Sequence, residues 1–181
     1  MKTQSHTIKD KEKALFDEMK GDFGFKNKME APQLVKVVIG SATGSVKDAN
    51  KKKLIGDRLT KITGQKVAEK AAKKSIATFK VREGDPVGYQ VTLRGDRMYS
   101  FLDKLVNIAL PRTRDFRGLK PEAIDAMGNF TIGVKEHTVF PETSDEELKD
   151  VFGFAVTIVT TSKDKKLTRA MLEKLGFLFK K

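Results

Sequence analysis

The sequence contains no cysteine and only two histidines among its 181 residues. Without cysteine, the chain can form no disulfide framework, no thiol nucleophile and no cysteine-ligated zinc site. It also lacks any apolar run near the roughly 20 residues that a membrane-spanning helix needs. The first residues are polar or charged rather than apolar, so we expect no secretory signal. These absences predict a soluble, cytoplasmic protein.

What the sequence has in excess is positive charge. Lysine and arginine number 36 against 24 aspartates and glutamates, which leaves a net charge of +12 at pH 7. Hydrophobic residues make up 39% and charged residues 33%, a balance typical of a globular chain. The length fits one domain with a real core. So large a positive excess indicates a polyanionic partner, with RNA or DNA first and an acidic membrane surface second.

Hydrophobic periodicity predicts alternating helices and strands. Helices are expected at residues 8–20, ending at Gly21, at 46–62, at 98–109, ending at Pro111, and at 167–175. Strands are expected at 34–39, followed by a turn over 40–45, and at 66–72, 89–94, 130–134, 137–140 and 154–160. The connection over 65–94 is too short and too polar for a helical crossover.

This pattern predicts one α+β domain over residues 1–181, built in two layers. We expect a largely antiparallel sheet with helices packed on one face, and a long protruding basic hairpin loop at about residues 71–86. A sheet covered on one side leaves its other face open, and several RNA-binding modules use such a face as a platform.

The positive charge is clustered in three segments. Residues 61–82 carry a net charge of +6, residues 104–120 carry +4 and residues 163–181 carry +5. Residues 141–151, in contrast, carry a net charge of −4. The acidic segment is most simply solvated, with Thr143 or Ser144 capping a short acidic turn over residues 145–151. The alternative is that it faces a basic protein.

The most informative of these segments is Ala71–Arg82, which mixes small, basic and single bulky residues. Its lysines and arginine can reach a phosphate backbone, Ser75 and Thr78 offer hydroxyl groups, and Phe79 can stack on a base or a sugar. The alternative is a solvated hairpin in which Ile76 and Phe79 tuck into the protein. Composition favours contact with RNA.

A second candidate is Pro111–Gly118, in which arginines alternate with other residues. Arginine suits planar, bidentate contacts with phosphates and bases. The alternative is that Asp115 pairs with a neighbouring arginine while Phe116 anchors the loop. We expect both interpretations to hold: Asp115 pairs with one arginine and Phe116 anchors the loop, and at least one arginine is left to contact a partner.

The sequence shows no residue pattern typical of a catalytic or a metal site. His6 and His137 stand apart, without a second histidine close enough in sequence for a metal pair, and the turn Gly40–Ser45 departs from the spacing of a phosphate-binding loop. We therefore expect no catalytic residue, no metal and no cofactor. The alternative functions are an RNA-dependent enzyme and a nucleic-acid-binding regulator. The former needs a buried reactive group and the latter usually needs a helix for the major groove.

Several segments stand in the order that one known family shows: Ile62–Lys66, Ala72–Ala77, Lys80–Gly84, Val91–Tyr99, Ala109–Gly118, Gly128–Gly133, Glu136–His137 and Phe140–Glu142. Through these segments the sequence resembles the bacterial large-subunit ribosomal protein of the "L-five" family, over about residues 8–179.

The resemblance implies a non-catalytic constituent of the large ribosomal subunit in the cytoplasm. Members of the family bind 5S rRNA in the central protuberance and help attach it to the large-subunit rRNA. They also contribute to a bridge toward a small-subunit ribosomal protein and approach the P-site tRNA through the hairpin loop. No membrane partner is implied.

Carried over by position, the resemblance assigns two groups of residues. The tRNA-binding group is Lys73, Lys74, Ser75, Thr78, Phe79, Lys80 and Arg82. The rRNA-binding group is Gln65, Lys66, Thr92, Arg94, Arg112, Arg114 and Arg117. Gln65 and Thr92 are the expected contacts with 5S rRNA, whereas the Arg112–Arg117 loop faces either RNA or the inter-subunit partner.

One position departs from the family pattern. The family commonly carries an Asn-x-Gly-x-Gly turn after the first strand, and this Asn contacts 5S rRNA. Here Ile39 stands in its place. Either that contact is missing or a nearby hydroxyl group, from Ser41 or Thr43, replaces it.

Overall fold

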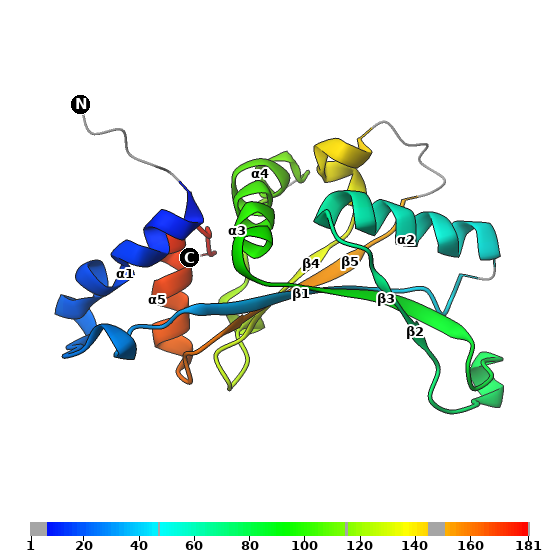
Figure 1. The fold of residues 1–181 in the computed structure, drawn as a ribbon, viewed down its shortest axis with the longest axis horizontal. Coiled ribbons are helices and arrows are strands. Elements are labelled where there is room, and N and C mark those ends of the chain that lie inside the picture. The colour runs from blue at the N-terminus through cyan, green and yellow to red at the C-terminus, as the bar shows by residue number, and fades with distance from the viewer. Residues whose placement is uncertain (1–6, 47, 115, 145–150, 181) are drawn as a thin grey trace. The chain divides into compact units, whose positions relative to one another are not determined.

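The computed structural model describes residues 7–46, 48–114, 116–144 and 151–180. Within these ranges it forms an α+β fold, as Figure 1 shows. The longer helices are α1 (Ile8–Phe23), α2 (Ala49–Thr63), α3 (Gly95–Lys104) and α5 (Lys165–Leu175). The strands are β1 (Leu34–Ala42), β2 (Ala68–Ala71), β3 (Pro86–Leu93), β4 (Phe130–Val134) and β5 (Phe154–Thr160).

The five strands form one open antiparallel sheet in the order β2-β3-β1-β5-β4. The α+β class and the antiparallel sheet are thereby confirmed. The β2–β3 pair runs in register from Ala68 opposite Gln90 to Ala71 opposite Pro86, with one irregularity between Lys70 and Ala71. This irregularity lies at the start of the basic loop that the sequence predicts at about residues 71–86.

The chain divides into two compact units. Unit 1 comprises Met1–Val37, Arg94–Ile132 and Thr157–Lys181, and unit 2 comprises Val38–Leu93 and Gly133–Val156. In unit 1, α1 packs against α3 and α5. In unit 2, α2 packs against β3, where the ring of Tyr89 lies so close to Gly56 that a Cβ on this glycine would be 3.1 Å from the ring.

Helix α1 is longer than the sequence predicted. It continues through Gly21 and ends at Gly24, which has a φ of 67° and donates its N–H to the Lys20 carbonyl. The prediction that Gly21 ends the helix is therefore wrong. Both glycines suit a helix end by composition, but Gly24 is the one that adopts the left-handed backbone of a C-cap.

The helix that begins at Gly95 also runs past its predicted end at Pro111. After α3, the chain forms a π-helical turn, η3 (Leu105–Ala109), and then α4 (Leu110–Arg112). The N–H of Leu110 bonds to the Leu105 carbonyl, so the wider turn begins a new helical segment with Pro111 in its first turn. A proline is tolerated there because its missing N–H is not required.

Strand β1 extends to Ala42, so the predicted turn over 40–45 is wrong in its first three residues. The backbone of β1 lies close to β3, since a Cβ on Gly88 would be 2.9 Å from the Ser41 carbonyl oxygen. Helix α2 begins three residues later than predicted, because Asp48 caps it by accepting a hydrogen bond from the Asn50 N–H at 2.8 Å. It ends at Gly64, as expected for a left-handed C-cap.

Residues His137–Val139 form a 3₁₀ helix (η5) and not the predicted strand. Contacts with Phe152 and Thr143 hold His137 in a fully buried position. Its N–H donates to the Phe152 carbonyl at 3.1 Å, its ring stacks on Phe152 at 4.2 Å, and its Nδ1 accepts the Phe152 N–H at 3.3 Å. Thr143 donates its hydroxyl to the His137 carbonyl at 2.9 Å. His137 therefore has a structural role, as the sequence indicated.

The predicted solvated acidic turn lies largely outside the described residues, because residues 145–150 are not described.

Candidate nucleic-acid interface

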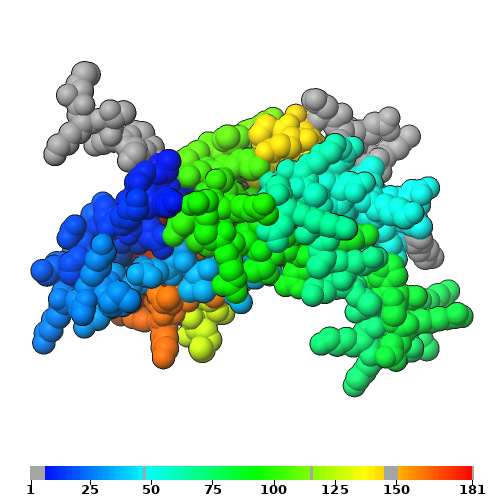
Figure 2. Space-filling model, viewed as in Figure 1, coloured from blue at the N-terminus to red at the C-terminus, as the bar shows by residue number. Residues whose placement is uncertain are grey.

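In unit 2, short backbone contacts order the segment between β2 and β3. Ala72 donates its N–H to the Asp85 carbonyl at 2.8 Å, and Ile76 and Val81 form an antiparallel bridge. The tip is a single 3₁₀ turn, η2 (Ala77–Phe79), followed by Lys80 with a φ of 53°. Residues 72–85 thus form an extension of the β2–β3 hairpin, which we call the basic hairpin. In Figure 2 this segment belongs to the green region at the lower right.

The side chains of the basic hairpin are directed to solvent. Phe79 is 72% exposed and Ile76 is 47% exposed, so the alternative that they tuck into the protein is wrong. The hairpin also exposes four cationic side chains, none of which forms an ion pair within the described part of the chain: Lys73, Lys74, Lys80 and Arg82.

The two hydroxyl groups of the hairpin differ. Ser75 accepts the N–H of Glu83 at 2.9 Å, which closes the loop. Thr78 is exposed and has no hydrogen-bond partner among the described residues. Thr78 therefore keeps both its donor and its acceptor for a partner.

A mostly apolar groove of about 670 Å³ runs beside the hairpin. Phe79, Ile76 and Val81 line it together with the turn at Gly44 and Ser45, and Lys73 and Lys74 also border it. An apolar wall with cations at its edge suits a flat base whose phosphate lies against the lysines.

The structure brings Gln65 and Thr92 together at the other end of β3, also in unit 2. The Gln65 side-chain amide donates to the Thr92 carbonyl at 3.4 Å, and the Thr63 hydroxyl donates to the Gln65 carbonyl at 3.1 Å. Both Gln65 and Thr92 are half-buried, and Lys66 beside them is exposed. Two polar side chains at a strand end with an adjacent cation can read a base edge or a sugar next to a phosphate.

In unit 1, the remaining predicted cations lie at the two ends of the α3–η3–α4 helix. Arg94 immediately precedes α3 and is exposed. The end of α4 exposes Arg112, and the loop after it exposes Arg114 and Arg117. None of these four arginines forms an ion pair with a described residue. Asp115 lies outside the described residues, so its expected pairing stays a prediction, whereas Phe116 is half-buried.

The position of the family asparagine offers no polar group to solvent. Ile39 is fully buried in β1. Ser41 is 5% exposed and donates its hydroxyl to the Gly153 carbonyl at 2.8 Å, and Thr43 is fully buried. The geometry therefore does not support a replacement contact from either hydroxyl.

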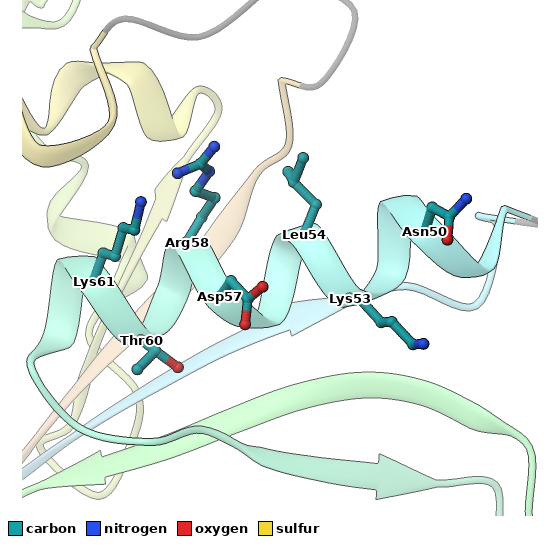
Figure 3. Close-up of a pocket in the computed structure, with 7 residues that line it drawn as sticks. All are labelled: Asn50, Lys53, Leu54, Asp57, Arg58, Thr60 and Lys61. Carbon is teal, nitrogen blue, oxygen red and sulfur yellow. The ribbon is translucent and has the colours of Figure 1, made fainter.

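Helix α2 also carries a cationic face that was not predicted from the sequence. Figure 3 shows Leu54, Arg58 and Lys61 pointing to one side of this helix, at the spacing that places residues on one face. Together with Lys53 and Asp57 on the neighbouring stripe, they border a shallow depression of about 520 Å³. The same spacing in the sequence could have identified the face.

The described ranges hold no group of three or more metal-ligating histidine, cysteine, aspartate or glutamate side chains. Over the same ranges, no helix has the length and the apolar character to cross a bilayer.

Comparison with known proteins matches this arrangement to one family. A model of ribosomal protein L5 matches residues 27–82, and a model of the C-terminus of the same ribosomal protein family matches residues 86–179. Both describe ribosomal proteins and not enzymes.

Similar proteins cover almost the whole chain. The large ribosomal subunit protein uL5 of Natranaerobius thermophilus is 48% identical over 163 residues, which are 89% of this chain and 90% of that protein. The uL5 protein of Sulfurimonas denitrificans is 46% identical over 175 residues, 96% of this chain and 97% of that protein. That of Desulfatibacillum aliphaticivorans is 49% identical over 162 residues, 88% of this chain and 90% of that protein. The chain thus belongs to the ribosomal protein L5 family, the structural proteins of the large ribosomal subunit that its sequence resembled.

Proposed function

We propose that this chain binds 5S rRNA and helps attach it to the large-subunit rRNA. The observation that carries the proposal is the set of exposed cations without ion pairs at the positions that the family resemblance assigns to RNA. A solvated cation with no carboxylate partner is available to neutralise a phosphate and to release its condensed counterion. Gln65 and Thr92, held together at the end of β3, supply polar groups beside those phosphates.

The basic hairpin is the proposed contact with the P-site tRNA. Its exposed Phe79 can stack on a base or a sugar while the flanking lysines contact phosphates. The Arg112–Arg117 loop is proposed to contact either rRNA or a small-subunit ribosomal protein across the subunit interface. A bidentate guanidinium suits a phosphate and a carboxylate equally, so the residues alone leave this choice to experiment.

A salt titration tests the first part. Filter binding of the full chain to 5S rRNA should give an affinity that falls steeply as the salt concentration rises. High-affinity binding that ignores ionic strength would contradict the proposal. Co-sedimentation with large subunits through a sucrose gradient tests assembly in the same preparation.

A triple variant separates the two RNA contacts. Lys73→Ala, Lys74→Ala and Arg82→Ala together should impair translation more than 5S rRNA affinity, because the hairpin is assigned to tRNA. The matched control replaces Lys20, Lys26 and Lys28, three exposed lysines of unit 1, and should change neither property. Equal loss of translation and of 5S rRNA affinity in the hairpin variant would refute the division.

A further inference from the structure

The structure joins two basic segments that lie far apart in the sequence. Leu119 donates its N–H to the Leu178 carbonyl at 2.7 Å, and Lys180 donates its N–H to the Leu119 carbonyl at 2.9 Å. The two segments therefore run side by side as a short parallel pair, with Leu119 opposite Phe179. Both belong to unit 1. We call Arg117–Lys120 together with Leu178–Lys180 the tail pair.

The tail pair has an inner and an outer face. Phe179 turns inward, where its ring lies 5.3 Å from that of Phe130 and 6.0 Å from the Arg169 guanidinium. Side chains alternate along an extended chain, so Leu178 and Lys180 turn the other way. Both are exposed, and Leu178 is 66% exposed. Lys120 is likewise exposed.

A glycine allows the two backbones to approach. Gly118 has a φ of +97°, and a Cβ at this position would be 2.9 Å from the Lys180 backbone nitrogen. Any other residue would be strained in this conformation and would also push the tail away. The close approach keeps the tail, with Lys180, against the segment that carries Arg117 and Lys120.

The charge of the tail pair has one sign. Residues 116–120 and 176–180 include Arg117, Lys120 and Lys180 and no acidic residue. Throughout the described chain, these three side chains form no ion pair. Arg169, which lies over the inward ring of Phe179, does form an ion pair, with Glu173 at 2.8 Å. The outer face therefore offers cations and one apolar side chain.

We propose that the tail pair is a further RNA-binding site, which takes the phosphate backbone of rRNA between Lys120 and Lys180 and packs Leu178 against a ribose or a base edge. The site extends the proposed rRNA binding to the C-terminal segment, and it rests on that function. An acidic protein surface is the competing occupant. RNA fits better because two neighbouring lysines next to a single apolar side chain suit a phosphate beside a sugar along a strand.

A charge-neutral variant tests the site in the full chain. Lys120→Gln with Lys180→Gln keeps both backbone bonds of the tail pair and removes two cations. In filter binding to 5S rRNA and to a transcript of the large-subunit rRNA, log affinity against log salt should become less steep by about 1.4–1.8 for the RNA that the site contacts, since each lost phosphate contact removes about 0.7 to 0.9. Lys26→Gln with Lys28→Gln is the matched control and should keep the slope of the unchanged chain.

A second readout uses the absence of cysteine in this sequence. Lys180→Cys introduces a unique thiol that can carry an iron chelate, whose hydroxyl radicals cleave nearby RNA. We expect localised rRNA cleavage from this position, at nucleotides that the same chelate at Lys28→Cys leaves intact.

The possible failures are distinguishable. If the unchanged chain does not bind rRNA, the proposed function falls. If it binds rRNA, but the Lys120→Gln/Lys180→Gln variant keeps the full salt slope and the Lys180→Cys probe cleaves no rRNA, the tail pair is overturned as an RNA site while the proposed function stands. Radical cleavage confined to a neighbouring ribosomal protein would also overturn it, in favour of the acidic protein surface.

Discussion

The hydroxyl groups of Ser75 and Thr78 show what single residues add to the sequence pattern. The family resemblance assigned both to tRNA contact, and their place in one basic segment by itself predicted contact with RNA. In the structure, Ser75 stabilises the hairpin through the Glu83 N–H, whereas Thr78 has no partner among the described residues. The residue types were predictable, but the division between folding and binding depends on the loop geometry, which composition does not encode.

At the same scale, Asp125 stabilises the turn before β4. Its carboxylate accepts hydrogen bonds from the backbone N–H groups of Met127 at 2.9 Å and Asn129 at 2.7 Å, and from the Asn129 side chain at 3.0 Å. Asp125→Ala should lower the free energy of unfolding by about 1 kcal/mol, the usual cost of losing such a capping side chain. Urea denaturation measures the difference. Asp22→Ala, at an exposed aspartate of the same unit, is the control and should change it little.

The contribution of Asp125 should depend on pH. Hydrogen bonds from Asn129 hold the pKa of the Asp125 carboxyl below its usual value. A group whose pKa is lowered by folding stabilises the protein above its unfolded pKa, and the stabilisation is lost as the pH falls through the folded pKa. The difference between the unchanged chain and Asp125→Ala should therefore be full near neutral pH and shrink below pH ~4. A difference that grows on acidification would contradict this account.

At the scale of elements, the basic hairpin is stabilised locally and contributes little to the core. Phe79→Ala should change the free energy of unfolding by less than about 0.5 kcal/mol, because a side chain that is 72% exposed has little packing to lose. P-site tRNA binding to ribosomes that carry the variant should weaken by about 1–3 kcal/mol if Phe79 stacks on a base. Met127→Ala, at a residue 65% exposed in unit 1, serves as control. Unchanged tRNA binding by the Phe79 variant would remove the stacking contact from the proposal.

In helix α1, the carboxylate of Glu12 links the helix to β1 and to α3 by hydrogen bonds. Glu12 accepts the Leu34 N–H at 2.6 Å through one oxygen and the Tyr99 hydroxyl through the other. Glu12→Ala leaves both donors without this acceptor in a part-buried place. It should cost about 2–3 kcal/mol of unfolding free energy, as expected for hydrogen bonds to a charged group. Glu18→Ala, on the same helix but more exposed, should cost much less.

Tyr99 reports the same contact spectroscopically. Burial, and then the hydrogen bond to Glu12, raise the pKa of the Tyr99 hydroxyl above its ordinary value. The protonated hydroxyl therefore stabilises the fold at neutral pH, and this contribution is lost as the pH rises through the folded pKa. The chain has only two tyrosines, so absorbance titration can follow each of them. Glu12→Ala should lower the Tyr99 pKa; an unchanged value would show that burial alone sets it.

Element boundaries were less predictable than the elements. Apolar periodicity identified α2, α3, α5 and β5, because each buries one stripe or one run of residues. The end of α1 differed because two glycines stand three residues apart and only Gly24 takes the left-handed backbone. The strand expected at 137–140 became a 3₁₀ helix because His137 bonds Phe152, a partner distant in sequence. Such tertiary contacts cannot be read from a local pattern.

At the scale of the whole molecule, the net charge of +12 predicted a polyanionic partner. The distribution of this charge predicted, in addition, which three segments contact that partner. The structure shows that cations from all three basic segments are exposed, while the tail pair joins two of those segments in unit 1. Sequence spacing could not have revealed this pairing, because it depends on Gly118 and on backbone bonds between distant residues. The exposed charge therefore gathers in several clusters, and each can be tested by its own set of substitutions.

The arginine loop gives the last prediction. Replacing Arg112, Arg114 and Arg117 with glutamine removes three exposed cations and leaves the buried side of unit 1 intact. If the loop binds rRNA, log affinity against log salt should become less steep by about 2–2.7. If it binds a small-subunit protein, rRNA affinity should hold and the association of the two ribosomal subunits should weaken instead. Measuring both quantities on one preparation decides between these partners, and a variant that changes neither would exclude the loop from both.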